Sequence, residues 1–474
     1  MTGPRESSLG EPEEIGSFVT RGLGDSTYLV ASGDEAVVVD PQRDAGRFMA
    51  AADAAGQRIV AVVETHVHND YVSGALEIQA ATGARIVAPA AGRYAFPHRP
   101  VEDGDTVDVG DLRLTALSTP GHTPEHLSWT VSRRDGEPYA VLTGGSLLAG
   151  SAGRTDLLGS DRTEELTTAQ FHSLRRLAAF SNEVRVLPTH GAGSFCMAGP
   201  AASDRTSTIG AERAANPLLA FSDEVGFRQA MLRDLGPYPT YYAEMAPINR
   251  AGPVVLGGVP APRRLEIGES SARSRSGAWV VDLRDRRAFA EAHLAGSLGI
   301  ELSDSFAGYV GWLVPYGAPL ILVVPPGARG ADEEAARAAA LQLHRIGWDA
   351  IEGWSPADPD AWRAAGSSLE SYEVLAADDV ADELGSGGSP TIVDVRGAAE
   401  WREGTLDGSV LRSLSDLARG VGDLPRDRAL TVLCASGERA SVASGWLQRA
   451  GFDVRLVAQG GAPAVLRRLG LTRA

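Results

Sequence analysis

Short apolar runs alternate with turn residues along the first half of the chain, and longer stretches with helical spacing lie between some of them. The clearest apolar runs cover residues 59–64, 140–143 and 184–187. The clearest helical stretches cover residues 75–82 and 167–180. Runs of this length suit buried strands, and helices between such strands are typical of layered α/β folds. The pattern therefore predicts an α/β sandwich over residues 15–250.

Two segments border this pattern. Residues 1–14 are polar and acidic, and we expect a flexible N-terminus there. Residues 251–263 are rich in Pro and Gly, which is typical of a linker. The predicted sandwich is thus separated from whatever follows it.

The chain after the linker repeats itself. Residues 279–297 match residues 391–409 position by position, with the Asp of an Asp-x-Arg turn in register. Each copy has an apolar strand, this turn, a helix, and later a second buried strand that runs into a Gly-containing loop. The duplication predicts two similar α/β domains at 264–367 and 372–474.

Charge and cysteine content narrow the function classes. The formal net charge of the 474-residue chain is -17, and an acidic surface repels phosphate backbones, so we expect no nucleic-acid partner. No stretch has eighteen continuous apolar residues, and the N-terminal segment lacks the apolar core of a signal peptide. We therefore expect a cytoplasmic protein without a membrane partner, in which Cys196 and Cys434 are thiols.

Cys434 stands at the end of a predicted buried strand, residues 429–433, and a predicted amphipathic helix follows at 440–450. Backbone N–H groups converge at such a helix start, where the helix dipole is positive. Both features favour a thiolate nucleophile and would stabilise a persulfide held on it. The residues of this cradle are Ala435, Ser436, Gly437 and Glu438.

The loop Cys434-Ala-Ser-Gly-Glu-Arg439 resembles the Cys-x-x-Gly-x-Arg active-site loop of rhodaneses, and motifs at 394–396 and 404–409 resemble earlier motifs of that family. The resemblance implies a sulfur-transfer site that contains Cys434 and Arg439. A tyrosine-phosphatase-like loop needs one more residue between Cys and Arg to admit a phosphate. The shorter spacing favours a single sulfur atom.

The first copy lacks this chemistry. Its equivalent strand, residues 321–324, runs into Pro325-Pro-Gly-Ala-Arg329, with Pro325 where the nucleophile would stand. Because it has no thiol, this copy cannot carry sulfur. We predict an inactive rhodanese-like domain that serves as a spacer or docking surface.

Three histidine loops in the first half each follow an apolar strand. The first contains His66, His68 and Asp70, the second contains His122, and the third contains His190. A His-x-His pair at a strand end can direct two imidazoles at one metal ion, and a nearby carboxylate can ligate the ion or orient a ligand. The loops therefore predict a metal site.

These loops resemble the metallo-β-lactamase fold, and phrases at 153–156 (Gly-Arg-Thr-Asp) and 190–196 (His-Gly-Ala-Gly-Ser-Phe-Cys) resemble its persulfide dioxygenase branch, which is fused to rhodaneses. The resemblance implies a metallo-β-lactamase αββα sandwich followed by two rhodanese-like domains. It also implies iron held by His66, His122 and an Asp in a Thr-Gly-Asp motif. This chain instead has Gly145 at that place, and Tyr71 where relatives of the fold carry another His.

The residues that match the first metal position remain, and we expect one ion at His66, His68 and His122. Asp70 and His190 are either further ligands or hydrogen-bond partners. The other histidines are predicted to be structural: His98, His126, His172 and His293. Fe(II) is the expected metal, with zinc and a metal-free domain as alternatives.

Two further residues are candidates for substrate binding. Arg154 matches the family Arg that contacts the carboxylate of the substrate thiol, and a guanidinium suits anionic thiols. A salt bridge with Asp156 is the alternative. Cys196 follows a Gly-rich loop after His190, so it either accepts sulfur near the metal or is a small buried side chain.

These observations favour an enzyme of sulfur metabolism that oxidises a low-molecular-weight thiol persulfide to sulfite at mononuclear iron and transfers sulfane sulfur through Cys434. The expected small-molecule partners are therefore that persulfide and sulfite. A zinc-dependent thioester hydrolase resembling glyoxalase II, joined to a rhodanese, is one alternative. A sulfurtransferase with a degenerate metal domain is another, and the sequence leaves open whether the chain forms a homo-oligomer.

Overall fold

The computed structural model describes residues 13–199, 204–327 and 330–471. The chain divides into two compact units, residues 1–260 with 344–347 and residues 261–343 with 348–474. Within the described residues, no helix has the length and apolar character needed to cross a membrane.

The first sheet of the N-terminal unit has six strands in chain order. They are β1 (Glu13–Thr20), β2 (Asp25–Ser32), β3 (Glu35–Val39), β4 (Arg58–Val63), β5 (Arg85–Pro89) and β6 (Arg99–Val101). Strands β1 to β3 are antiparallel, and β3 to β6 are parallel. The parallel pairs β3–β4 and β4–β5 need crossovers, which α1 (Gly46–Ala54) and α2 (Ala75–Thr82) provide.

The second sheet of this unit has the order β14-β13-β10-β9-β8-β7. Its strands are β7 (Thr106–Val109), β8 (Leu112–Ser118), β9 (Leu127–Arg133), β10 (Ala140–Gly144), β13 (Arg185–Pro188) and β14 (Ser207–Thr208). The remaining elements are β11 (Leu147–Leu148), β12 (Ser151–Ala152), α3 (Ser160–Leu177), α4 (Ile209–Ala215), α5 (Glu224–Arg233), α6 (Tyr242–Ala251) and the single turns η1 (Ala90–Gly92) and η2 (Pro217–Ala220).

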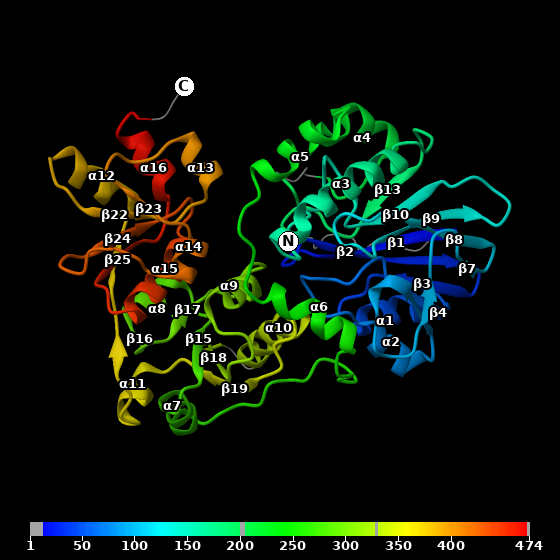
Figure 1. The fold of residues 1–474 in the computed structure, drawn as a ribbon. Coiled ribbons are helices and arrows are strands. Elements are labelled where there is room, and N and C mark those ends of the chain that lie inside the picture. The colour runs from blue at the N-terminus through cyan, green and yellow to red at the C-terminus, as the bar shows by residue number, and fades with distance from the viewer. Residues whose placement is uncertain (1–12, 200–203, 328–329, 472–474) are drawn as a thin grey trace. The chain divides into compact units, whose positions relative to one another are not determined.

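Apolar side chains join these layers in the order helix, sheet, sheet, helix. Val37 and Val63 of the first sheet pack with Trp129 of the second in one core between the sheets. Phe48 of α1 packs on the outer face of the first sheet, and Leu174 of α3 packs on the outer face of the second. Figure 1 shows α1 and α2 on one side of the sheets and α3, α4 and α5 on the other. The predicted αββα sandwich is confirmed.

The C-terminal unit contains two parallel sheets of the same design. The first has the order β17-β15-β18-β19, and the second has the order β21-β25-β24-β22-β23. The first copy consists of β15 (Trp279–Asp282), β17 (Leu298–Gly299), β18 (Leu320–Val324), β19 (Ile351–Pro356), α7 (Ile267–Arg275), α8 (Arg286–Glu291), α9 (Phe306–Leu313), α10 (Ala331–Arg345) and α11 (Pro359–Ala364). A two-stranded ribbon of β16 (His293–Leu294) and β20 (Leu369–Glu370) lies beside it.

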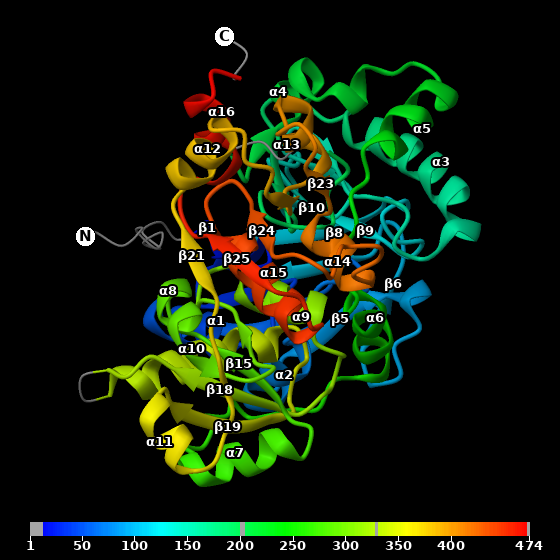
Figure 2. The same cartoon turned by 90° about the vertical axis from the view of Figure 1, so that its left-hand side faces the viewer.

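The second copy consists of β21 (Glu373–Leu375), β22 (Thr391–Asp394), β23 (Val410–Leu411), β24 (Leu430–Leu433), β25 (Val454–Val457), α12 (Ala377–Gly385), α13 (Ala398–Glu403), α14 (Leu414–Arg419), α15 (Glu438–Arg449) and α16 (Gly461–Arg468). Figure 2 shows α15 beside β24 and β25. The duplication extends to single atoms. Arg284 Nη2 donates to Asp282 Oδ2 at 2.7 Å, and Arg396 Nη2 donates to Asp394 Oδ2 at the same distance.

Some predicted boundaries differ from the observed ones. Of the N-terminal segment 1–14, residues 1–12 lie outside the described residues, and the last two begin β1, where they pair with β2. The helix expected from residue 167 begins at Ser160, because its first turns are polar and carry no apolar signal. Residues 252–263 contain no helix or strand, and the linker there stays a prediction.

Candidate metal centre and sulfur-transfer site

Three buried histidines converge in the N-terminal unit. His66 follows β4, His122 follows β8 and His190 follows β13, and all three side chains are fully buried. One ring nitrogen of each lies within 4.8 Å of the other two. The Nε2 atoms of His66 and His190 are 3.4 Å apart, which is close enough for both to reach one ion.

Each of these rings is oriented through its other nitrogen. The Nδ1 of His122 lies 2.8 Å from the backbone oxygen of Arg154, and the Nδ1 of His190 lies 2.8 Å from Asp25 Oδ1. The Nε2 of His122 is buried and has no hydrogen-bond partner among the described residues. A metal-binding imidazole needs this arrangement, with one nitrogen held and the other free. The three rings therefore fit a metal ion.

Burial and charge set the protonation of the histidines. Burial lowers the pKa of His122 to about 3 and that of His66 well below its ordinary value, and charge on neighbouring histidines adds to this. Both rings are thus neutral, the form that binds metal. His190 differs, because Asp70 and Asp25 outweigh its burial and raise its pKa to about 10. A metal ion at His190 would have to displace a proton.

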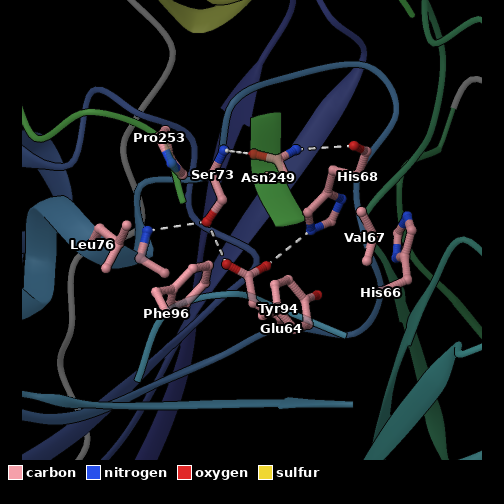
Figure 3. A pocket seen from close by; sticks show the side chains of 11 residues that line it. Glu64, His66, Val67, His68, Ser73, Leu76, Tyr94, Phe96, Asn249 and Pro253 are labelled. Atoms are coloured by element: carbon pink, nitrogen blue, oxygen red, sulfur yellow. Dashed lines mark hydrogen bonds and ion pairs between the residues drawn. The ribbon is translucent and has the colours of Figure 1, made fainter. Parts of the chain in front are cut away.

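His68 is not grouped with both His66 and His122, although the sequence predicted these three as one set. Its Nε2 lies 3.0 Å from Glu64 Oε2 and 3.0 Å from the Tyr71 hydroxyl. Figure 3 shows Glu64 between His68 and Ser73. His66, His122 and His190 form one group, whereas His68 belongs to two others, one with Asp40 and His66 and one with Asp70 and His190. The Nδ1 of His68 is buried and has no hydrogen-bond partner among the described residues, so His68 stays a predicted ligand.

Asp40 joins two of the histidine loops and was not found from the sequence. Its Oδ1 accepts the Thr65 backbone N–H at 2.7 Å, and its Oδ2 accepts the hydroxyls of Thr65, at 2.7 Å, and Thr189. Its φ of 53° is left-handed, a conformation that Asn, Asp and Gly tolerate best. Thr65 precedes His66 and Thr189 precedes His190, so Asp40 fixes both loops.

Asp25 and Asp40 each gave one weak signal in the sequence. Asp40 ends an apolar run, and Asp25 lies three positions before the run that starts at Tyr28. Asp70, which the sequence did single out, lies 3.3 Å from His190 Nδ1 and forms one group with His68 and His190.

Gly145 occupies the place of the expected carboxylate, and no side chain fits there. A Cβ added to it would overlap the ring of His122. Its backbone N–H donates to His126 Nε2 at 2.9 Å, and His126 Nδ1 lies 2.9 Å from the Thr119 hydroxyl. The His126 ring therefore has a partner at each nitrogen. A site of two histidines and one carboxylate at this position does not fit the chain.

Arg154 and Cys196 lie beside the His122 loop. The guanidinium of Arg154 binds both carboxylate oxygens of Asp156 at 2.7 Å and lies over the ring of Tyr238. The salt bridge proposed as the alternative for Arg154 is therefore present. Cys196 is fully buried, and burial raises the pKa of its thiol well above the ordinary value. This favours a neutral thiol.

The Cys434 loop joins β24 to α15. Cys434 is fully buried, and its Sγ accepts the backbone N–H of Gly437 at 3.1 Å. Gly437 has a φ of 102°, and a Cβ there would overlap the carbonyl oxygen of Ala458. Only glycine suits this position, because the loop must turn tightly for the N–H to face the sulfur. The cradle that the sequence predicted at 435–438 leads directly into the first turn of α15.

Arg439 lies at the side of this loop and is paired. Its Nη1 and Nη2 donate to the two carboxylate oxygens of Glu400 at 2.6 and 2.7 Å, and this pair raises the pKa of Arg439. In the first copy, β18 ends at Val324 and Pro325 follows. Residues 328–329 of the predicted loop lie outside the described residues.

Comparison with known protein families gives one match for the part of the chain with the histidine loops and another for the part with Cys434. Residues 20–190 match the model of the Metallo-beta-lactamase superfamily, and residues 376–463 match that of the Rhodanese-like domain. A hydroxyacylglutathione hydrolase of Maricaulis maris is 38% identical over 162 residues, which are 34% of this chain and 58% of that protein. The match thus spans less than two thirds of that relative.

Two solved structures are also similar. The metallo-beta-lactamase from Staphylococcus aureus subsp. aureus COL has a TM-score of 0.65 and 26% identity over 73% of this chain and 100% of its own. ETHE1 from Myxococcus xanthus has a TM-score of 0.44 and 26% identity over 50% of this chain and 98% of its own. The chain thus combines an N-terminal metallo-beta-lactamase domain with a C-terminal rhodanese-like domain.

Proposed function

We propose that the protein is an enzyme of sulfur metabolism. Its N-terminal domain would oxidise a low-molecular-weight thiol persulfide to sulfite at one metal ion, and Cys434 would carry and transfer sulfane sulfur. The observation that carries this proposal is the Gly437 N–H directed at Cys434 Sγ, in a chain that also groups three buried histidines. We also propose a cytoplasmic location, since neither cysteine forms a disulfide.

For the metal site we propose Fe(II) held by His66, His122 and His190, with zinc as the alternative. When bound, Fe(II) would supply the activation of O2 at its open positions. The protein's own contribution is to keep the rings of His66 and His122 neutral through burial, and to fix the rings of His122 and His190 through the partner of each Nδ1. Burial of all three rings also limits the access of water to the ion.

The second candidate is a zinc-dependent thioester hydrolase, supported by the likeness to a hydroxyacylglutathione hydrolase. Hydrolysis of this kind generally uses two metal ions that clamp one water molecule. Gly145 offers no carboxylate for a bridge, and the Tyr71 hydroxyl faces His68. These two substitutions favour the single-metal reaction. A sulfurtransferase whose N-terminal domain binds no metal is the third candidate.

Metal analysis of the full chain, combined with two assays, distinguishes the three candidates. We expect bound iron and oxygen consumption with glutathione persulfide, and no hydrolysis of a glutathione thioester. The variant His66→Ala should lose metal and oxygen consumption, whereas the exposed His172→Ala, matched in chemistry, should keep both. Zinc with thioester turnover would support the second candidate. Absence of bound metal, with Cys434-dependent sulfur transfer intact, would support the third.

A further inference from the structure

The inactive domain contacts the loop that holds Cys434. Ser303, which precedes α9, donates its hydroxyl to Glu438 Oε1 at 2.8 Å. Arg286, the first residue of α8, places its Nη1 3.4 Å from the backbone oxygens of Ser436 and Ala458. Both contacts fall within one compact unit. The inactive domain thus forms one wall of the sulfur-transfer site.

The positive and negative side chains along this wall do not balance. Arg439 is bound on two atoms by Glu400, and Arg286 is bound on two atoms by Glu301. The charge of Glu438 helps to raise the pKa of Arg286, but the hydrogen bond that Glu438 accepts comes from the hydroxyl of Ser303. Three carboxylates therefore face two guanidiniums, and one negative charge is left over.

Nearby groups do not cancel this charge. Burial and the charge of Glu438 raise the pKa of Tyr309, so its hydroxyl stays neutral. Asp285 and Arg287, both exposed at the start of α8, add one charge of each sign. Glu438 is a member of the six-residue loop, so its charge lies about one Debye length or less from the sulfur.

We propose that Glu438, held by Ser303 of the inactive domain, selects the sulfur acceptor of Cys434 by charge. The acceptor is a low-molecular-weight thiol that is neutral or cationic near its sulfur, and sulfite, a dianion, is disfavoured. This inference rests on the proposed sulfur-carrying role of Cys434.

The transfer step conserves atoms and electrons. The acceptor thiolate attacks the outer sulfur of the Cys434 persulfide and forms a new S–S bond. The bond between the outer sulfur and Cys434 Sγ breaks, and its electron pair stays on Cys434 as a thiolate. The acceptor leaves as a persulfide that keeps the proton of the outer sulfur, so no external oxidant or reductant is needed.

A charge series of small thiols tests the proposal on the full chain without oxygen, so that persulfide oxidation does not interfere. The protein is loaded with inorganic polysulfide, and the mass of the peptide that contains Cys434 reports one added sulfur. Discharge is then followed with cysteamine, 2-mercaptoethanol, 3-mercaptopropionate and sulfite, and thiol rates are divided by the thiolate fraction. We expect rates to fall by about fivefold with each added negative charge, from a Coulomb interaction within one Debye length at a dielectric constant between those of protein and water.

Three variants test which residues produce the charge dependence of the discharge rates. Glu438→Gln should leave cysteamine unchanged, because its thiolate form has no net charge, and should speed discharge to 2-mercaptoethanol by about fivefold and to 3-mercaptopropionate and sulfite by about twenty-fivefold. Ser303→Ala keeps the carboxylate but frees it, and should reduce the charge dependence. Asp360→Asn removes an exposed carboxylate on α11 and should leave all four rates unchanged.

The outcomes are distinguishable. A charge dependence that survives in Glu438→Gln would overturn the role of Glu438, and one that is unaltered in Ser303→Ala would overturn that of the inactive domain. If Cys434 takes up no sulfur, the proposed sulfur-carrying function itself fails. Loading that succeeds, followed by discharge to sulfite that Glu438→Gln does not accelerate, contradicts the inference alone.

Discussion

Replacement of Asp40 should loosen the metal centre through two separate effects. In Asp40→Ala, the buried backbone N–H of Thr65 loses its acceptor, which costs about 1–3 kcal/mol. The left-handed φ of 53° adds about 1 kcal/mol, because Ala has no polar side chain to support it. Asp40→Asn keeps an acceptor for Thr65 and tolerates this φ, so its cost should be about 1 kcal/mol.

Hydrogen exchange followed by mass spectrometry measures these costs locally in the full chain. A loss of about 3 kcal/mol corresponds to roughly hundredfold faster exchange in peptides that cover residues 64–71 and 188–191. Asp40→Asn should give about fivefold faster exchange there. A peptide from β24 in the other unit serves as the internal control. Equal exchange in the Ala and Asn variants, or an equal change in β24, would refute the reasoning.

Three further predictions concern the two sites. Gly145→Asp should lower metal affinity rather than create a ligand, because the new side chain overlaps the ring of His122. Equilibrium dialysis measures this affinity, and tighter metal binding by the variant would contradict the prediction. Gly437→Ala should slow alkylation of Cys434 by iodoacetamide at least tenfold, since the strained loop turns its N–H away from the sulfur. Arg439 keeps the pKa of Glu400 below 4.5 despite partial burial, so the pair stabilises the fold above that pH and this contribution is lost as the pH falls. The stability difference between the protein and Glu400→Gln, measured by denaturant titration, should therefore shrink below pH 4.5.

Features encoded within a few residues were predictable. The Cys434 loop is local, because its strand, thiol, glycine and helix start occupy ten consecutive residues, and both its fold position and its cradle follow from them. The histidine loops were found for the same reason, since each follows an apolar strand. The Asp-x-Arg turns likewise appear in both copies as short, self-contained ion pairs.

Features that depend on distant residues were not predictable. His190 forms one group with His66 and His122, although it lies 124 positions from His66 along the chain. Asp25 is 165 positions from the histidine that it orients. No periodicity or spacing in one sequence reports such a pairing, because it arises only when strands from different sheets pack together.

The tight backbone at Gly145 limits how the metal site can be altered. A Cβ at Gly153 would overlap the carbonyl oxygen of Gly145, and a Cβ at Gly145 would overlap His122, whose loop is in turn tied to Gln170 on α3. A side chain introduced at position 145 by a single substitution therefore meets an occupied space. A carboxylate at this place would require the His122 loop or the chain at Gly153 to shift first.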